Sequence, residues 1–222
     1  MEEINRQLES KGFKVSGRKE SVVDATIVKS SRRPRKVISS EEISEDRKEE
    51  ESEESSNENK VEYSSDTEAK WLRKGKKSYY GYKAFAVVDS EGYFELGMVK
   101  GANVSESKEF LNLLEKIKSE KGTNIYCDKG YSSRENRDLL KERGYNDFIM
   151  HKNVRGKKLS EFLKKLNRYI SSKRFVVEQF FGTLKRLYGL ERFKYLGTKR
   201  GEYELYMCGI CYNLKKAVNL MC

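Results

Sequence analysis

The sequence contains little cysteine, proline, histidine or tryptophan, and it has no long apolar segment. Its 222 residues include four cysteines, one proline, one histidine and one tryptophan. Four unevenly spaced cysteines are too few for a disulfide scaffold. The N-terminus lacks the basic-then-apolar pattern of a secretory signal, and no apolar run approaches the roughly 18 residues that span a bilayer. These absences exclude a small secreted scaffold and a membrane protein, and they predict a soluble, cytoplasmic protein.

Positive charge is plentiful and unevenly distributed. The chain has 46 Lys and Arg residues against 35 Asp and Glu residues, a net charge of +11. Between Glu41 and Lys60, ten acidic residues face three basic ones, so this segment carries −7 and the remaining residues carry +18. From His151 onward, 17 basic residues face five acidic ones. A basic body of this kind favours an anionic partner such as nucleic acid.

The acidic segment predicts an interruption of the fold. Residues at about 32–65 are rich in Ser and Glu and almost free of large apolar side chains. Such a segment buries too little surface to offset its ordering entropy, so we expect a disordered insertion within a single domain of residues 1–222. It could act as a DNA mimic that shields the basic body. An insertion in a tolerant surface loop is the favoured interpretation.

Hydrophobic periodicity predicts an α/β fold. Apolar and β-branched runs indicate five strands, at 21–28, 79–89, 93–100, 124–128 and 147–150. Helical spacing, serine caps and glycine stops indicate helices at 105–119, from 132 or 133 to 143, and from about 166 to 188. We therefore expect a mixed five-stranded sheet flanked by helices.

Three carboxylates stand out by their context. Asp24 lies inside an apolar strand, where an ionised carboxylate is costly unless it is paired or bound to a metal. Asp128 ends a strand, and ligand sites of open α/β sheets collect at such ends. Glu178 lies on the long helix, on a side that can reach over the sheet edge. Three oxygen donors would suit Mg²⁺ or Mn²⁺. Spacing alone does not decide, because Arg174 and Glu178 also form an ordinary i,i+4 pair.

Five short motifs carry a resemblance to a known family. In chain order they are Val22-Val-Asp24-Ala-Thr, Gly81-Tyr-Lys83, Ala102-Asn103, Cys127-Asp128-Lys-Gly-Tyr131 and Arg174-x3-Glu178-x6-Lys185. With these motifs the chain resembles the catalytic part of bacterial insertion-sequence transposases of the DDE type, which have an RNase H-like fold. The resemblance implies a catalytic triad of Asp24, Asp128 and Glu178 that holds two Mg²⁺ or Mn²⁺ ions. It also implies DNA cleavage at transposon ends, strand transfer to target DNA, and association with the bacterial nucleoid.

Two departures from the family pattern qualify that expectation. The family's helix signature begins with Tyr three residues before the Arg, where this sequence has Ser171; Tyr169 is near but out of register. Only about 20 residues precede Asp24, so the N-terminal region for end recognition is expected to be missing. Two alternatives to an active transposase therefore stay open: an inactive DNA-binding remnant and a stand-alone RNase H-like nuclease.

Basic residues near the expected triad suggest contacts with double-stranded DNA. Arg174 and Lys185 lie on the same helix face as Glu178 and are expected to contact phosphates, although a solvated helix face would show the same pattern. The weaker candidates lie near the motifs or in a basic tract that precedes the long helix: Lys83, Lys129, Arg155, Lys157 and Lys158.

Three further features have a competing structural explanation, which we favour. Trp71 could stack on an extruded base, but packing at the domain edge is more common. Cys208 and Cys211 have zinc-like spacing, yet no second pair exists and His151 is distant, so both are expected to be core thiols. The apolar stretch 205–220 is expected to cover the sheet, and the alternative is a homodimer surface.

Overall fold

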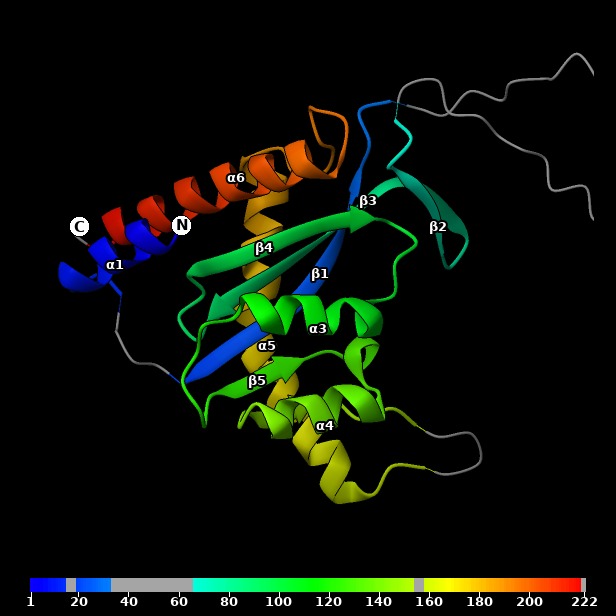
Figure 1. Ribbon diagram of the computed structural model, residues 1–222, viewed down its shortest axis with the longest axis vertical. Coiled ribbons are helices and arrows are strands. Elements are labelled where there is room, and N and C mark those ends of the chain that lie inside the picture. Colours follow the sequence, from blue (N-terminus) through cyan, green and yellow to red (C-terminus); the bar gives the residue numbers. More distant parts are fainter. Residues whose placement is uncertain (15–18, 33–65, 154–157, 221–222) are drawn as a thin grey trace, which may run out of the picture.

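The computed structural model describes residues 1–14, 19–32, 66–153 and 158–220 (Figure 1). The elements are, in chain order, α1 (Glu2–Ser10), β1 (Glu20–Lys29), β2 (Lys70–Lys74), β3 (Lys77–Asp89), β4 (Phe94–Gly101), α3 (Glu106–Lys116), β5 (Asn124–Cys127), the 3₁₀ turn η1 (Lys129–Tyr131), α4 (Arg134–Glu142), β6 (Asn146–Ile149), α5 (Glu161–Leu187) and α6 (Thr198–Val218). The expected α/β order is therefore confirmed.

The sheet is mixed and has one strand more than expected. Its order is β2-β3-β1-β5-β6, and β4 also pairs with β3. Strand β3 has 13 residues, so its first part pairs with β2 and the rest with β4. The prediction of five strands was wrong because it missed β2. That strand reads Lys-Trp-Leu-Arg-Lys and is mostly exposed, so it lacks the apolar run by which the other strands were recognised.

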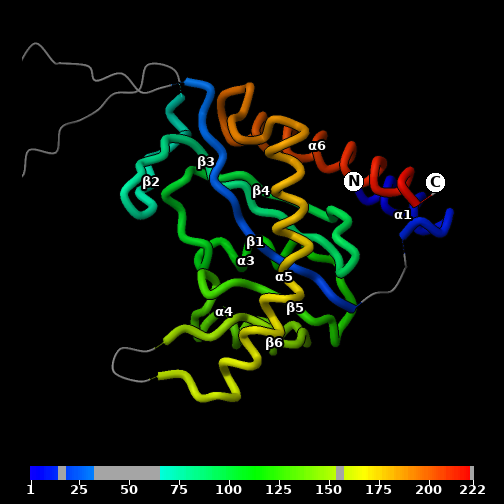
Figure 2. Tube along the Cα trace, turned by 180° about the vertical axis from the view of Figure 1, so that it is seen from behind, coloured from blue at the N-terminus to red at the C-terminus, as the bar shows by residue number. Residues whose placement is uncertain are grey.

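Two helical layers cover the sheet. Helices α5 and α6 pack on one face, and α3 and α4 lie on the other (Figure 1, Figure 2). Side chains of a strand alternate between the two faces. In β1, Val22 belongs to the core under α5, and Val23 belongs to the core under α3. Asp24 follows Val23 and therefore faces α5.

Helix α5 crosses the sheet over β1 and β5 (Figure 2). It begins at the Ser160 cap, whose hydroxyl accepts from Leu163 N, and is therefore longer at its start than the sequence indicated. The side of α5 that faces the sheet is buried and includes Val177, Phe180 and Leu184. Leu187, the last residue of the helix, is exposed.

Helix α6 lies close against β4. A Cβ atom at Gly209 would stand 2.2 Å from the Phe94 ring, so only glycine permits this approach. The Asn213 side chain fixes the contact: its Oδ1 accepts from Phe94 N at 2.9 Å, and its Nδ2 donates to Phe94 O at 2.9 Å. The stretch 205–220 thus covers the sheet with one side of α6, as expected.

The expected acidic insertion lies outside the described residues, but the chain on both sides of it is described. The Asp66 carboxylate accepts hydrogen bonds from Ser30 Oγ and Tyr82 OH, and the Asp66 carbonyl accepts from Tyr80 OH at 2.5 Å. We call this group the Asp66 clasp. It joins the chain just after β1 to the chain just before β2. Within the described part, no helix is long and apolar enough to cross a membrane.

Candidate active site

The three carboxylates selected from the sequence come together. Strands β1 and β5 are parallel neighbours, and Val23 pairs with Cys127. Asp24 and Asp128 each follow one of these paired residues, so they lie side by side at the same level of the sheet. Glu178 reaches the same point from α5, which crosses above. Asp24 and Glu178 are more than 150 residues apart in the sequence, and the pairing of β1 with β5 and the crossing of α5 bring them together.

Arg174 lies at the centre of the group. Its Nη2 is 2.7 Å from Asp24 Oδ2, and its Nη1 is 3.5 Å from Asp128 Oδ1 and 3.9 Å from Glu178 Oε1. The arginine side chain is only 8% exposed. Its Nε has no hydrogen-bond partner among the described residues. Three carboxylates therefore converge on a single buried cation.

Burial differs across the group, and so does its effect on charge. Burial raises the pKa of Asp24 to about 6, even though the adjacent guanidinium and the Ala25 N–H favour its ionised form. Asp128 and Glu178 are more accessible, with side chains 42% and 55% exposed. The site is thus deepest at Asp24 and opens toward solvent at the other two carboxylates.

The donor set fits a divalent cation. Carboxylate oxygens are the ligands that Mg²⁺ and Mn²⁺ prefer. In the described part of the chain, no three His, Cys, Asp or Glu side chains are already placed to hold a metal ion. The point on which the three carboxylates converge is taken by the Arg174 guanidinium instead.

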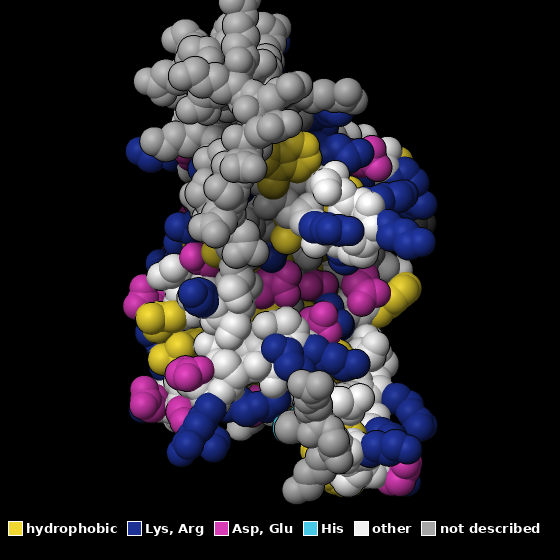
Figure 3. Space-filling model, turned by 90° about the vertical axis from the view of Figure 1, so that its right-hand side faces the viewer, with side chains coloured by type: hydrophobic (Ala, Val, Ile, Leu, Met, Phe, Trp, Pro, Cys, Tyr) yellow, Lys and Arg dark blue, Asp and Glu magenta, His cyan; other side chains and the backbone are white. Residues whose placement is uncertain are grey.

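The DNA-binding residues expected from the sequence lie in different environments. Lys185 is partly buried, and burial lowers its pKa. Lys129 is exposed directly after Asp128, and Lys158 is exposed just before α5. Arg155 and Lys157 lie outside the described residues. On the face shown in Figure 3, acidic side chains gather across the middle of the molecule and basic ones lie above and below them.

Lys83 is engaged within the fold. Its side chain is buried, and Nζ donates to Val104 O at 2.8 Å. The same Nζ lies 3.2 Å from Glu106 Oε1. Glu106 in turn sits against Gly130, where a Cβ atom would stand 2.0 Å from Glu106 Oε2. Glu106 was not selected from the sequence. Its position in the first turn of α3, shortly after the Ala102-Asn103 motif, was the available signal.

Ser171 stands where the family's helix signature has Tyr, and Tyr169 is the nearest tyrosine in the sequence. Ser171 is exposed on α5. The Tyr169 hydroxyl lies 3.3 Å from the Tyr126 hydroxyl, and its ring lies under the Lys173 ammonium at 5.9 Å. Tyr169 thus packs beside β5, against Tyr126 and Phe148.

The remaining features follow the favoured structural explanations in part: Trp71 packs at the domain edge, but the expectation of a core thiol was wrong for Cys211, which is exposed because it lies on the outward side of α6. Trp71 is 48% exposed and packs against Tyr80 at the sheet edge. Cys208 is partly buried and Cys211 exposed, and burial raises the pKa of Cys208 to about 11, which keeps its thiol protonated. The outward side of α6 carries exposed apolar residues: Tyr203, Met207, Leu214 and Val218.

Comparisons with known proteins agree with this geometry. A family model described as a transposase DDE domain matches residues 16–214. The transposase for insertion sequence element IS1106 from Neisseria meningitidis serogroup B is 40% identical over 220 residues, which cover 99% of this chain and 72% of that protein.

A structural comparison supports the RNase H-like fold. The cryo-EM structure of a piggyBac transposase synaptic complex with hairpin DNA matches with a TM-score of 0.50 and 12% identity. The match covers 96% of this chain and about half of the other, 53%. At this identity the likeness concerns the fold alone.

Proposed function

The chain belongs to the transposase DDE domain family, and we propose that Asp24, Asp128 and Glu178 are the catalytic triad of its DNA cleavage and strand-transfer reaction. DDE transposases of this kind cut DNA and join the freed strand to a target. The observation that supports the assignment is the convergence of these three carboxylates, from two parallel strands and a crossing helix, on one cation. We also propose that residues 1–222 form a single catalytic domain around this site.

The family generally uses divalent metal ions, and we propose two Mg²⁺ or Mn²⁺ ions for this chain. Such ions, when bound, activate the attacking water or hydroxyl and stabilise the leaving oxygen. Asp24 would supply the deepest ligand, and Asp128 and Glu178 the ligands nearer to solvent. Burial raises the pKa of Asp24, and a strong cation nearby would favour the ionised form of this carboxyl. Arg174, once displaced from the carboxylates, is then free to pair with a phosphate.

DNA is the partner that the family implies, and the chain's basic residues would hold its phosphates. Lys129 directly follows Asp128, and Lys185 lies on α5 two turns after Glu178, so both suit phosphates that flank the site. Lys158, Arg155 and Lys157 belong to the basic tract that would extend the contact. Lys83 would act by holding Glu106 and the chain near Val104. A DNA partner also implies association with the nucleoid of a bacterial cell.

We further propose that the chain forms a homodimer through α6. Tyr203, Met207, Leu214 and Val218 form an apolar stripe on the side of the helix that faces away from β4. An exposed stripe of this length suits a second copy of the same helix. Leu214→Glu should shift the protein to a monomer in light scattering, whereas Lys215→Glu, one residue further on the exposed side, should leave the dimer intact. A monomeric parent protein would contradict the proposal.

A nicking assay tests the triad. Supercoiled plasmid is incubated with the purified protein and Mg²⁺ or Mn²⁺, beside the variants Asp24→Ala and Glu178→Gln and the control Glu142→Gln on the exposed side of α4. We expect nicking by the parent and the control, and none by the triad variants. No nicking by the parent would favour the inactive remnant, and equal nicking by all would exclude the triad. Nicking that is never followed by strand transfer would favour the stand-alone nuclease.

A further inference from the structure

A basic groove continues from Asp24 along the second half of β1. Its floor is the strand segment that directly follows Asp24, Ala25 to Ile27. Strands β2 and β3 form one wall, and the end of α5 with the chain after it forms the other. The cavity has a volume of about 620 Å³. We call it the β1 groove. Its lining begins at Ala25, the residue after Asp24, so one end of the groove lies next to that carboxylate in the chain.

The lining of the β1 groove is predominantly cationic. Lys29, Arg73, Lys74 and Lys185 line it together with the ion-paired Lys83, while the acidic lining consists of Glu106 and Glu191. Glu106 is already neutralised by its contact with Lys83. Burial lowers the pKa of Lys185; the nearby Glu191 carboxylate opposes this shift, and the positive charges of Lys74 and Lys29 add to it. The five basic side chains outnumber the two acidic ones, so the lining favours an anionic occupant.

A second cavity extends the groove away from Asp24. It has a volume of about 400 Å³ and shares Lys29 and Tyr79 with the first. Arg32, Arg192 and the half-exposed ring of Trp71 also line it. At about 3.3 Å per strand residue, the path from Asp24 to Lys29 is roughly 17 Å long. An extended single strand of a few nucleotides would span that length.

We propose that the β1 groove binds an unpaired DNA strand as it leaves the scissile phosphate. Lys29, Arg73, Lys74 and Lys185 contact successive phosphates, and Trp71 stacks on a base at the outer end. The proposal rests on the proposed function only for the position of the scissile phosphate at Asp24. A channel of cations that ends on an exposed aromatic ring is the pattern by which proteins hold single strands. A small anion would not need cations spread over the whole path.

The fluorescence of Trp71 offers a direct test, because it is the only tryptophan in the chain. The protein is titrated at low salt, in the presence of EDTA, with a single-stranded oligonucleotide of about 20 nucleotides and with a blunt duplex of the same sequence. We expect the single strand to quench the fluorescence as a base stacks on the ring, and the duplex to quench it far less. Binding of the single strand without quenching, or equal quenching by both, would overturn the proposal.

Charge reversal tests the phosphate contacts. Arg73→Glu/Lys74→Glu is compared with Lys118→Glu/Lys121→Glu, which makes the same change at exposed positions before β5, at the far end of that strand from Asp128. We expect the first pair to weaken single-strand affinity about tenfold and to reduce the salt slope by about 2. The control pair should change affinity less than about twofold. Equal losses in both pairs would overturn the proposal.

The same variants separate this proposal from the proposed function. All binding is measured without divalent ions, so it does not depend on catalysis. If Arg73→Glu/Lys74→Glu loses affinity while no protein nicks DNA, the groove is confirmed and the triad assignment fails. If nicking depends on Asp24 and Glu178 while this double variant binds like its control, the triad stands and the groove fails.

Discussion

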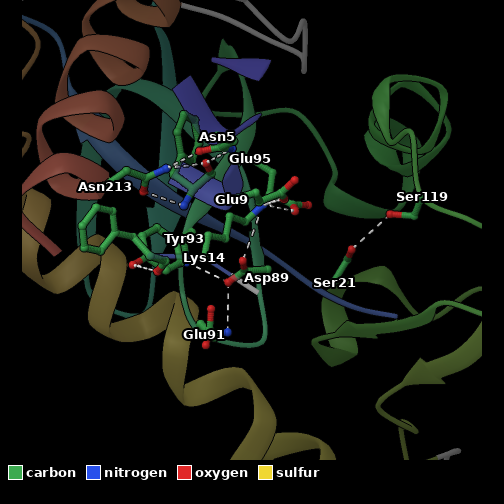
Figure 4. Close-up of polar contacts among 12 residues, drawn as sticks. Asn5, Glu9, Lys14, Ser21, Asp89, Glu91, Tyr93, Glu95, Ser119 and Asn213 are labelled. Atoms are coloured by element: carbon green, nitrogen blue, oxygen red, sulfur yellow. Dashed lines mark hydrogen bonds and ion pairs between the residues drawn. The ribbon is translucent and has the colours of Figure 1, made fainter. Parts of the chain in front are cut away.

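Among the residues that the structure describes, two clusters consist of one cation surrounded by three carboxylates, and one of them resembles a catalytic site. The first is Arg174 with Asp24, Asp128 and Glu178. The second is Lys14 with an acidic residue from α1, one from the end of β3 and one from β4: Glu9, Asp89 and Glu95 (Figure 4). Because the residue types are so similar, composition does not distinguish the two clusters.

The Lys14 cluster is closed. Lys14 Nζ lies 3.2 Å from Glu9 Oε1, 3.3 Å from Glu95 Oε1 and 3.7 Å from Asp89 Oδ2. Lys14 and Asp89 are both buried. The second Asp89 oxygen, Oδ1, accepts the backbone N–H groups of Glu91 and Tyr93 at 2.9 and 2.8 Å (Figure 4). The cluster therefore fixes the turn between β3 and β4 and attaches the chain after α1 to it.

The Arg174 cluster is open by comparison. Two of its three carboxylates are about half exposed, and its strongest ion pair is with the buried Asp24. The backbone adds little, since Asp24 Oδ1 accepts only the N–H of the next residue, Ala25. Accessible carboxylates that are not clamped by the backbone can be approached by a second cation from solvent. Accessibility and the lack of backbone clamps, more than charge, distinguish the candidate site from the Lys14 cluster.

The largest expected difference between the clusters is catalytic. Asp24→Asn should reduce metal-dependent nicking by about 10³-fold or more, because one triad carboxylate is lost. Asp89→Asn, the same change in the closed cluster, should keep nicking within about threefold of the parent once folding is confirmed by circular dichroism. Comparable losses of nicking in two well-folded variants would remove the functional distinction between the clusters.

The second expected effect concerns stability. Lys14→Met should lower the free energy of unfolding by about 3 kcal/mol at pH 7, because it leaves buried carboxylates without their cation. Burial raises the pKa of Asp89 and of Glu95, so protonation of these groups favours the folded state. The loss should therefore shrink as the pH falls through these raised pKa values. Urea unfolding at pH 7 and pH 5 measures it, and a loss that grows toward pH 5 would contradict the assignment.

The third effect is on metal binding. Arg174→Met should strengthen Mn²⁺ binding about tenfold, or about 1.4 kcal/mol, because no guanidinium competes for the three carboxylates. Electron paramagnetic resonance of free Mn²⁺ measures the affinity, with Lys173→Met as the neighbouring control. Lys14→Met should create no Mn²⁺ site, since its carboxylates stay clamped. Weaker binding in Arg174→Met would mean that the arginine supports the ligands and does not compete with metal.

The smallest expected effect is the difference in stability between neutralising one glutamate of the Arg174 cluster and one of the Lys14 cluster. Glu178→Gln should change the free energy of unfolding by less than about 0.5 kcal/mol, because its carboxylate is half exposed and 3.9 Å from its partner. Glu95→Gln should cost about 1 kcal/mol, because it removes a largely buried ion pair. Thermal or chemical unfolding of both variants at pH 7 checks the order. A larger loss of stability for Glu178→Gln than for Glu95→Gln would show that the Arg174 cluster contributes more to stability than the Lys14 cluster.

The sequence predicted the strands that have an apolar run and the carboxylates that belong to them. Asp24 within such a run and Asp128 at the end of another were recognisable because the strand pattern fixes where a side chain points. Strand β2 was missed because its exposed Lys-Trp-Leu-Arg-Lys sequence resembles a charged loop. Its presence depends on β3, which is long enough to pair with β2 as well as with β1 and β4.

The position of Arg174 could be predicted only in part. Its i,i+4 relation to Glu178 follows from helix geometry. Its shorter contact with Asp24 depends on how α5 crosses β1, which no local pattern encodes. The Lys14 cluster was missed for the same reason, because Lys14 and Asp89 meet only when the chain after α1 returns to the end of β3. Long-range ion pairs follow from topology and could not be derived from spacing.

The Asp66 clasp has a consequence for how this chain can vary. Ser30, Tyr80 and Tyr82 hold Asp66 from one stretch of sheet, so the two ends of the intervening segment are fixed to each other by contacts outside that segment. The cost of closing a flexible loop grows only by about 0.6 kcal/mol for each doubling of its length. Insertions or deletions between Ser30 and Asp66 should therefore have little effect on the stability of the sheet, so a foreign domain could be inserted at this position.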